Sequence, residues 1–195
     1  MHVIYIYKYF KKIACDLTEK YVFSAETEMY FFKYGKKPRQ IKIALFQVAE
    51  KDMGGSSGAM YSLFFESAAV ECEKAKLIDA ELFGKAFGLG LDAIMKYGRA
   101  QPGDRTMVDA LYPAFNSYKT TLASTKSSLK AMEAATCSAE EGAKNTLNMK
   151  AAAGRASYVA TSELRHSDPG AHAIGIIFRA VFEGIKIKAN EMGIN

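Results

Sequence analysis

The sequence has few of the residues from which disulfide frameworks, metal centres and membrane spans are built. Its three cysteines are odd in number and form no CxxC pair, which argues against a disulfide framework or a zinc site and favours reduced thiols. Its three histidines show no metal-ligand spacing. No apolar run approaches the roughly 20 residues of a membrane helix, and the N-terminus lacks a signal-peptide pattern. We therefore expect a cytoplasmic protein.

The motifs of several common enzyme classes are also missing. The chain contains no GxSxG elbow, no HExxH pair and no Cys/His nucleophile arrangement. No GKS or GKT follows its glycine-rich segments, which excludes a Walker P-loop. What remains is a globular composition: 49% of the 195 residues are hydrophobic and 24% are charged. These values predict one domain with a sizeable core.

The net charge of +5 comes largely from residues 8–42. A basic segment can bind nucleic acid, but no recognition motif accompanies this one, so a solvated basic segment is the favoured interpretation. A mildly basic protein would also suit a phosphate-rich ligand. Residues 1–40 are rich in aromatic and basic residues without a helical period, whereas residues 41–195 show clear helical periodicity.

The periodicity predicts an all-α fold. Met60, Phe64 and Ala68 are expected to form the buried stripe of one helix, and Leu147 is expected to face inward from another. Gly98 is expected to cap a helix C-terminus. The predicted helices cover about residues 41–52, 56–74, 80–97, 106 onward with a kink at Pro113, 124–150, and 168 onward.

Two glycine-containing helix starts look suited to an anion. In MGGSSGAMYSLFF (53–65), a Gly-Gly turn leads into a helix at Ser56 and Ser57. Free N–H groups beside small hydroxyl residues make an anion site, although a simple turn with a serine N-cap explains the same letters. In SDPGAHA (167–173), Asp168 is a good N-cap and Pro169 is ideal at the first helical position.

Two further segments carry charge at helix junctions. YGRAQPGDRTMVDALYPAF (97–115) holds two arginines and two aspartates within eleven residues around a Pro-Gly turn, which is more than a turn requires. In GRASYV (154–159), a glycine is expected to break the long helix, leaving Arg155 at a helix end. No single segment identifies a function.

Taken in order, the four segments closely resemble the nucleotide-binding (L-type) domain of the dihydroxyacetone kinase family, in the form found in its animal members. The resemblance covers roughly residues 41–190. It implies a closed barrel of eight antiparallel helices with the nucleotide at one end. The family transfers phosphate from ATP to dihydroxyacetone or glyceraldehyde, animal-type members also act as FMN cyclases, and a related bacterial subunit carries ADP.

The resemblance also implies which residues contact the nucleotide. Ser56 and Ser57 would lie at the phosphates, and Gly98 would approach the nucleotide where a side chain would not fit. Asp104 and Arg105 would shape the loop that leads to Thr106 and Met107.

Five more contacts follow for the nucleoside end. Thr106 and Met107 would line the adenine, while Asp168, Pro169 and Gly170 would close the ribose or base side.

The chain departs from the family in two respects. Family members hold two magnesium ions on an Asp-Gly-Asp loop, and this sequence contains no Asp-Gly-Asp. The kinase also needs a K-type domain that binds the triose. We therefore expect a non-family segment at 1–40, an L-type domain at 41–195, and no kinase activity from this chain alone. Segment 1–40 is either a structural substitute for the family's first helices or a mispredicted exon or intron. The alternative is a non-catalytic module that pairs with a K-type domain or holds an apolar ligand. The sequence does not decide between a monomer and a homodimer. Nucleic-acid binding is the least favoured of the three hypotheses.

Overall fold

The computed structural model describes residues 55–74, 79–160 and 163–191. Within these ranges every regular element is a helix or a 3-10 turn, which confirms the all-α prediction, and no described helix is long and apolar enough to cross a membrane. The predicted helix at 41–52 lies outside the described residues. The elements are α4 (Gly55–Lys74), α5 (Ala80–Gly98), α6 (Val108–Thr125), α7 (Ser128–Asn145), η2 (Thr146–Asn148), η3 (Arg155–Tyr158) and α8 (Pro169–Glu191).

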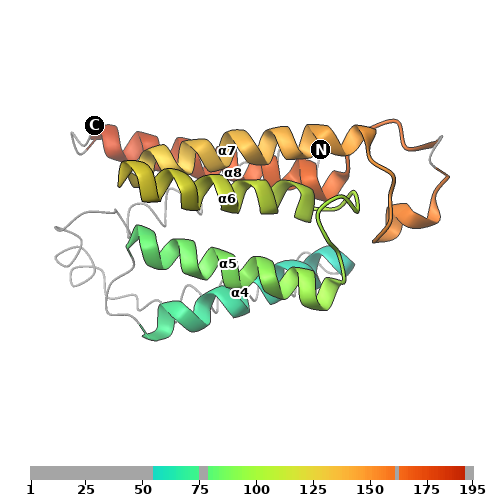
Figure 1. The fold of residues 1–195 in the computed structure, drawn as a ribbon, viewed down its shortest axis with the longest axis horizontal. Helices are drawn as coiled ribbons and strands as arrows, with labels where there is room; N and C mark the ends of the chain where they lie inside the picture. Colours follow the sequence, from blue (N-terminus) through green and yellow to red (C-terminus); the bar gives the residue numbers. More distant parts are fainter. Residues whose placement is uncertain (1–54, 75–78, 161–162, 192–195) are drawn as a thin grey trace. The chain divides into compact units, whose positions relative to one another are not determined.

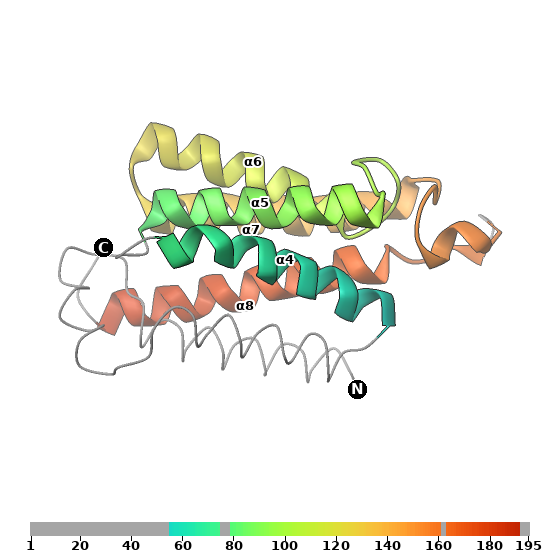
Figure 2. The same ribbon diagram turned by 90° about the horizontal axis from the view of Figure 1, so that it is seen from below.

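The chain divides into two compact units between Arg99 and Ala100. One contains the antiparallel pair α4 and α5, and the other contains α6, α7 and α8, whose directions alternate (Figure 1). Figure 2 shows the same helices from below. Each unit is described by itself.

Aromatic rings and a glycine hold α4 against α5. The rings of Phe64 and Phe87 meet edge to face with centroids 5.9 Å apart. A Cβ atom added at Gly90 would lie 2.6 Å from the Phe64 ring, so the helices approach closely there. The predicted stripe of α4 is only partly right, because Met60, Phe64 and Ala68 are half-buried. The deepest side chains of α4 instead belong to Tyr61, Ser62 and Ala69.

The ends of α5 follow local capping rules with one exception. Asp79 is the N-cap, and its carboxylate accepts a hydrogen bond from the Leu82 amide at 2.7 Å. At the other end the predicted glycine cap is wrong, because Gly98 is still helical and Arg99 takes the left-handed conformation, with φ 52°. A side chain at Gly98 would meet the Met60 Sδ atom at 2.8 Å. Gly98 therefore serves packing against α4.

Alanine dominates the packing of α6, α7 and α8. Small side chains let helix axes approach closely, so each helix presents a row of alanines with no exposed surface. The members with no exposed surface are Ala110, Ala114, Ala131, Ala135, Ala139, Ala171 and Ala180.

The closest approach of α6 and α7 combines a proline with a glycine. Pro113 has no N–H to donate to the carbonyl of Asp109 four residues earlier. That carbonyl faces Gly142 of α7, where an added Cβ would lie 2.2 Å from the Asp109 oxygen and 3.0 Å from Pro113 Cγ. Proline therefore frees a carbonyl, and glycine makes room for it. The helix continues through Pro113 to Thr125.

The single long helix predicted for 124–150 is wrong. Lys126 adopts φ 55° and ends α6, and Ser127 then caps α7, accepting a hydrogen bond from the Lys130 amide at 3.3 Å. The far end turns into η2 at Thr146. This change of direction leaves Leu147 48% exposed instead of inward-facing.

We predict that Gly142→Ala destabilises the protein. The added methyl group would overlap the backbone oxygen of Asp109, and overpacking of this kind costs about 1–3 kcal/mol. Gly175→Ala in α8 is the matched control, because its Cβ would make only an ordinary contact at 3.5 Å and alanine is the better helix former by up to about 1 kcal/mol. Urea unfolding of both variants checks this, and equal stabilities would contradict the packing account.

Candidate functional site

The segment between Gln101 and Val108 folds into a tight loop under the control of two aspartates. Asp104 Oδ2 accepts a hydrogen bond from the Gln101 amide at 2.7 Å. The buried carboxylate of Asp109, in the first turn of α6, accepts one from the Gly103 amide at 2.5 Å and one from the Thr106 amide at 2.8 Å. Satisfying these backbone donors fixes Thr106 directly before the helix.

Arg105 is buried and joins three segments of the chain. Its side chain is 2% exposed, and its backbone lies in the left-handed region with φ 61°. Its Nε donates to the carbonyl of Thr146 at 3.1 Å, and an Nη donates to the carbonyl of His166 at 2.5 Å. A non-glycine residue keeps such a backbone conformation only where its surroundings hold it. Here the guanidinium contacts connect the loop to η2 and to the start of α8.

The start of α8 agrees with the predicted cap. Asp168 precedes the first helical residue, Pro169, and its Oδ2 accepts a hydrogen bond from the Ala171 amide at 2.9 Å. A Cβ added at Gly170 would lie 3.0 Å from that same carboxylate and 3.5 Å from Met107 Cβ. The tightest neighbour of position 170 is therefore the capping carboxylate of Asp168, and Met107 lies next to this first turn of α8.

Burial raises the pKa of Asp168. Loss of water around the carboxyl group is the main cause, and it outweighs the hydrogen bond from Ala171 and the positive charge of Arg105, both of which lower the pKa. The charged form of Asp168 is thus disfavoured in the folded protein.

The remaining predicted contacts lie in the α4–α5 unit. Gly55 adopts φ 58° and begins α4, which places the exposed Ser56 and Ser57 in its first turn. That turn carries no acidic residue. The Gly98 end of α5 lies near the start of α4, because Met60 of α4 fills the space next to Gly98.

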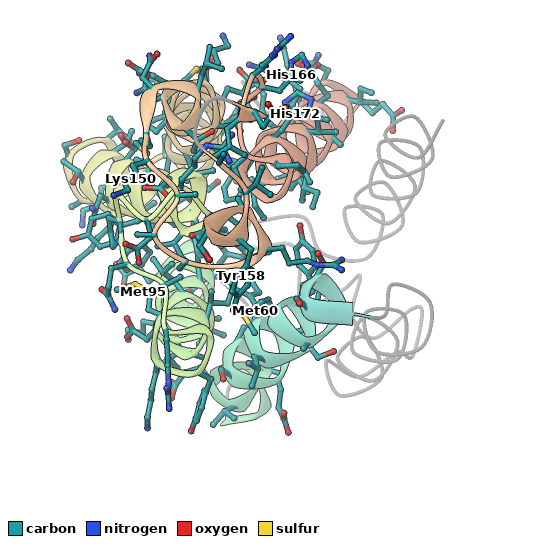
Figure 3. The ribbon with its side chains drawn as sticks, turned by 90° about the vertical axis from the view of Figure 1, so that its right-hand side faces the viewer. Met60, Met95, Lys150, Tyr158, His166 and His172 are labelled. Carbon is teal, nitrogen blue, oxygen red and sulfur yellow. The ribbon has the colours of Figure 1, made fainter. Side chains whose placement is uncertain are left out.

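The GRASYV segment forms a turn at the surface. Gly154, with φ 70°, precedes η3, but it does not break the long helix as predicted, because α7 has already ended at Asn145. Arg155 is exposed, and Tyr158 is 91% exposed. Figure 3 labels Tyr158 on this turn and shows His166 and His172 near the start of α8.

The structure brings the predicted residues together within each unit. Met107 lies beside the first turn of α8 and Thr106 directly precedes Met107 in the chain, while Ser56 and Ser57 lie in the first turn of α4. Sequence reasoning missed Thr146, which fell inside the predicted long helix. The Ser127-Ser128 pair could have signalled the separate start of α7. Among the described residues, no group of three His, Cys, Asp or Glu side chains could hold a metal ion.

Comparison with known proteins assigns the fold and these motifs to one family. The DAK2 domain model matches residues 27–183, so the chain belongs to the DAK2 domain family. The match begins inside the segment 1–40 that we expect to be non-family, and the boundary at residue 40 stays a prediction.

Individual relatives include kinases and a kinase subunit. Triokinase/FMN cyclase of Rattus norvegicus is 43% identical over 152 residues, which are 78% of this chain and 26% of the relative. The ADP-binding subunit DhaL of the PEP-dependent dihydroxyacetone kinase of Escherichia coli is 35% identical over 122 residues, covering 63% of this chain and 58% of the subunit. This chain therefore spans about a quarter of the animal relatives' length.

Solved structures agree with the assignment. The dihydroxyacetone kinase of C. freundii in its native form matches with a TM-score of 0.54 and 28% identity, over 93% of this chain and 34% of that one. The same kinase in complex with AMP-PNP and Mg²⁺ matches with a TM-score of 0.51 and 27% identity, over 93% of this chain and 32% of that one.

We predict that Asp168→Asn is at least as stable as the native protein at pH 7, whereas Asp168→Ala is less stable by about 1 kcal/mol because it loses the cap. Asparagine caps as well as aspartate and avoids the buried charge. Because the pKa of Asp168 is raised, its stabilising contribution is full at low pH and is lost as pH rises through that pKa.

The stability of the native protein relative to Asp168→Asn should therefore fall as pH rises above the ordinary carboxyl pKa of about 4. Urea unfolding at several pH values measures this difference. A native protein that gains stability over the asparagine variant as pH rises would contradict the account.

Proposed function

We propose that this chain is the ATP-binding domain of a dihydroxyacetone or glyceraldehyde kinase and that it does not transfer phosphate on its own. The observation that carries the proposal is the proximity of Met107 to the first turn of α8 at Gly170, next to the loop that Arg105 connects to η2 and to the start of α8. It joins two of the family's motifs, GDRTM and DPGA, at one end of the α6–α8 unit. The relatives described as an ADP-binding subunit and as a complex with AMP-PNP support it.

The phosphates would bind at the N-terminal turn of α4. The amide groups at the start of a helix and the helix dipole favour an anion there. The exposed hydroxyls of Ser56 and Ser57 add donors, and no acidic side chain in the first turn competes with a phosphate.

The nucleoside would contact the residues around Thr106 and Asp168 in the α6–α8 unit. Half-buried Thr106 and Met107 offer a hydroxyl and a flexible apolar side chain that suits the flat face of a base. Asp168, Pro169 and Gly170 would close the ribose or base side. Asp109 and Arg105 keep the backbone of this group in place before any ligand arrives, which lowers the ordering cost of binding.

Phosphoryl transfer itself would depend on groups outside the described residues. Magnesium supplies charge neutralisation and alignment in such reactions, yet no described cluster fits it and the sequence has no Asp-Gly-Asp. The triose would have to come from a K-type domain or subunit. The same observations favour an alternative, a non-catalytic module that pairs with a K-type domain.

Calorimetry with the 195-residue chain tests the proposal. ADP should bind, and magnesium should strengthen ATP binding only weakly. Ser57→Asp should abolish binding, because its carboxylate repels phosphate, while the stability of α4 is kept or raised by an acid in its first turn. Ser67→Asp places the same charge further along α4 and should bind ADP normally. A native chain that binds neither ADP nor ATP with magnesium would overturn the proposal.

A further inference from the structure

Thr146 occupies a position where its hydroxyl connects the end of α7 to the start of α8. The residue has no exposed surface. Its Oγ1 donates to the carbonyl of Ala143 at 2.6 Å and accepts from the backbone amide of Asp168 at 2.8 Å. Its own carbonyl accepts from Arg105 Nε at 3.1 Å. The side chain therefore donates one hydrogen bond to α7 and accepts one from the start of α8.

The bond to the Asp168 amide completes a helix cap. In a capping box, a Glu or Gln three residues after the N-cap reaches back to the N-cap amide. That position in α8 is Ala171, which has no side-chain acceptor. The Thr146 hydroxyl supplies the missing acceptor from another element. One half of the cap is local, from Asp168 to Ala171, and the other half is tertiary.

We propose that Thr146 is a positioning residue for the nucleoside: its hydroxyl holds the N-cap amide of Asp168 and so sets the distance between Gly170 and Met107. This inference rests on the proposed function. The first turn of α8 lies next to Met107, since a Cβ at Gly170 would make an ordinary contact with Met107 Cβ at 3.5 Å. A small displacement of Asp168 would change the gap in which the base or ribose is placed.

Removal of the hydroxyl should weaken ADP binding as well as folding. Thr146→Val keeps the shape and leaves the buried Asp168 amide without its acceptor, so the first turn of α8 is expected to move to regain a partner. Because ADP binding would have to reverse that movement, we expect a loss of ADP affinity of about tenfold. Thr146→Ser keeps the hydroxyl and should bind ADP within about twofold of the native chain. Thr146→Cys replaces the serine oxygen by sulfur, which donates and accepts hydrogen bonds only weakly. Its ADP affinity should lie between those of the valine and serine variants.

The experiment measures the ADP dissociation constant of the full 195-residue chain and its three variants by calorimetry. Thermal unfolding in the same buffer gives the folded fraction. The amide proton of Asp168 is followed by NMR, since loss of its acceptor should shift it upfield in the valine variant but not in the serine variant. This signal reports on the hydrogen bond itself, which a general loss of stability would not move.

The outcomes separate the two proposals. A native chain that binds no ADP refutes the proposed function before any variant is made. Native-like ADP affinity in folded valine and cysteine variants overturns only the role of Thr146. If the valine variant does not fold, the serine and cysteine pair decides: equal ADP affinity contradicts the inference, and weaker binding by cysteine supports it.

Discussion

The buried guanidinium of Arg105 is the interaction on which the arrangement of the α6–α8 unit depends. A buried charge is tolerated only where polar groups surround it, and here two backbone carbonyls, those of Thr146 and His166, accept its protons. These carbonyls belong to segments 41 and 61 residues away in sequence. One side chain therefore brings the loop before α6, the end of α7 and the start of α8 to one place.

The alanine rows and the contact between Gly142 and the Asp109 carbonyl provide the rigid base for this network. Asp109 shows the connection directly. Its carbonyl lies against Gly142, while its carboxylate accepts hydrogen bonds from the amides of Gly103 and Thr106. Close helix packing and the loop that would meet a nucleotide are thus fixed by the same residue. A movement of α7 against α6 would displace Asp109 and, through its hydrogen bond, the backbone of Thr106.

The sequence predicted those features that depend on neighbouring residues. Asp168 and Pro169 begin α8 as expected, because an N-cap and its proline act within one turn. The helix from Gly55 to Lys74 and the all-α class followed from periodicity. Predictions failed where distant contacts decide. Gly98 is needed for packing against Met60, so the left-handed cap falls on Arg99.

The same reasoning explains the misplaced end of α7 and the missed role of Thr146. Leu147, Met149 and the alanines at 151–153 favour a helix past Asn145, whereas Thr146 at the turn is hydrogen-bonded to Arg105 and Asp168. The predicted nucleotide contacts came from motif resemblance, and the geometry adds the reason that Thr106, Met107 and Gly170 belong together. Hydrogen bonds between segments so far apart in sequence leave no local pattern to read.

The central claim is that one end of the α6–α8 unit receives the nucleoside of a bound nucleotide. Titration of the isotope-labelled chain with ADP, followed by amide NMR shifts, tests it most directly. The account predicts that the amides of Thr106, Met107 and Gly170 shift together with a single dissociation constant, while that of Lys119, on an exposed part of α6, stays unchanged. ADP binding that leaves those three amides unmoved would contradict it.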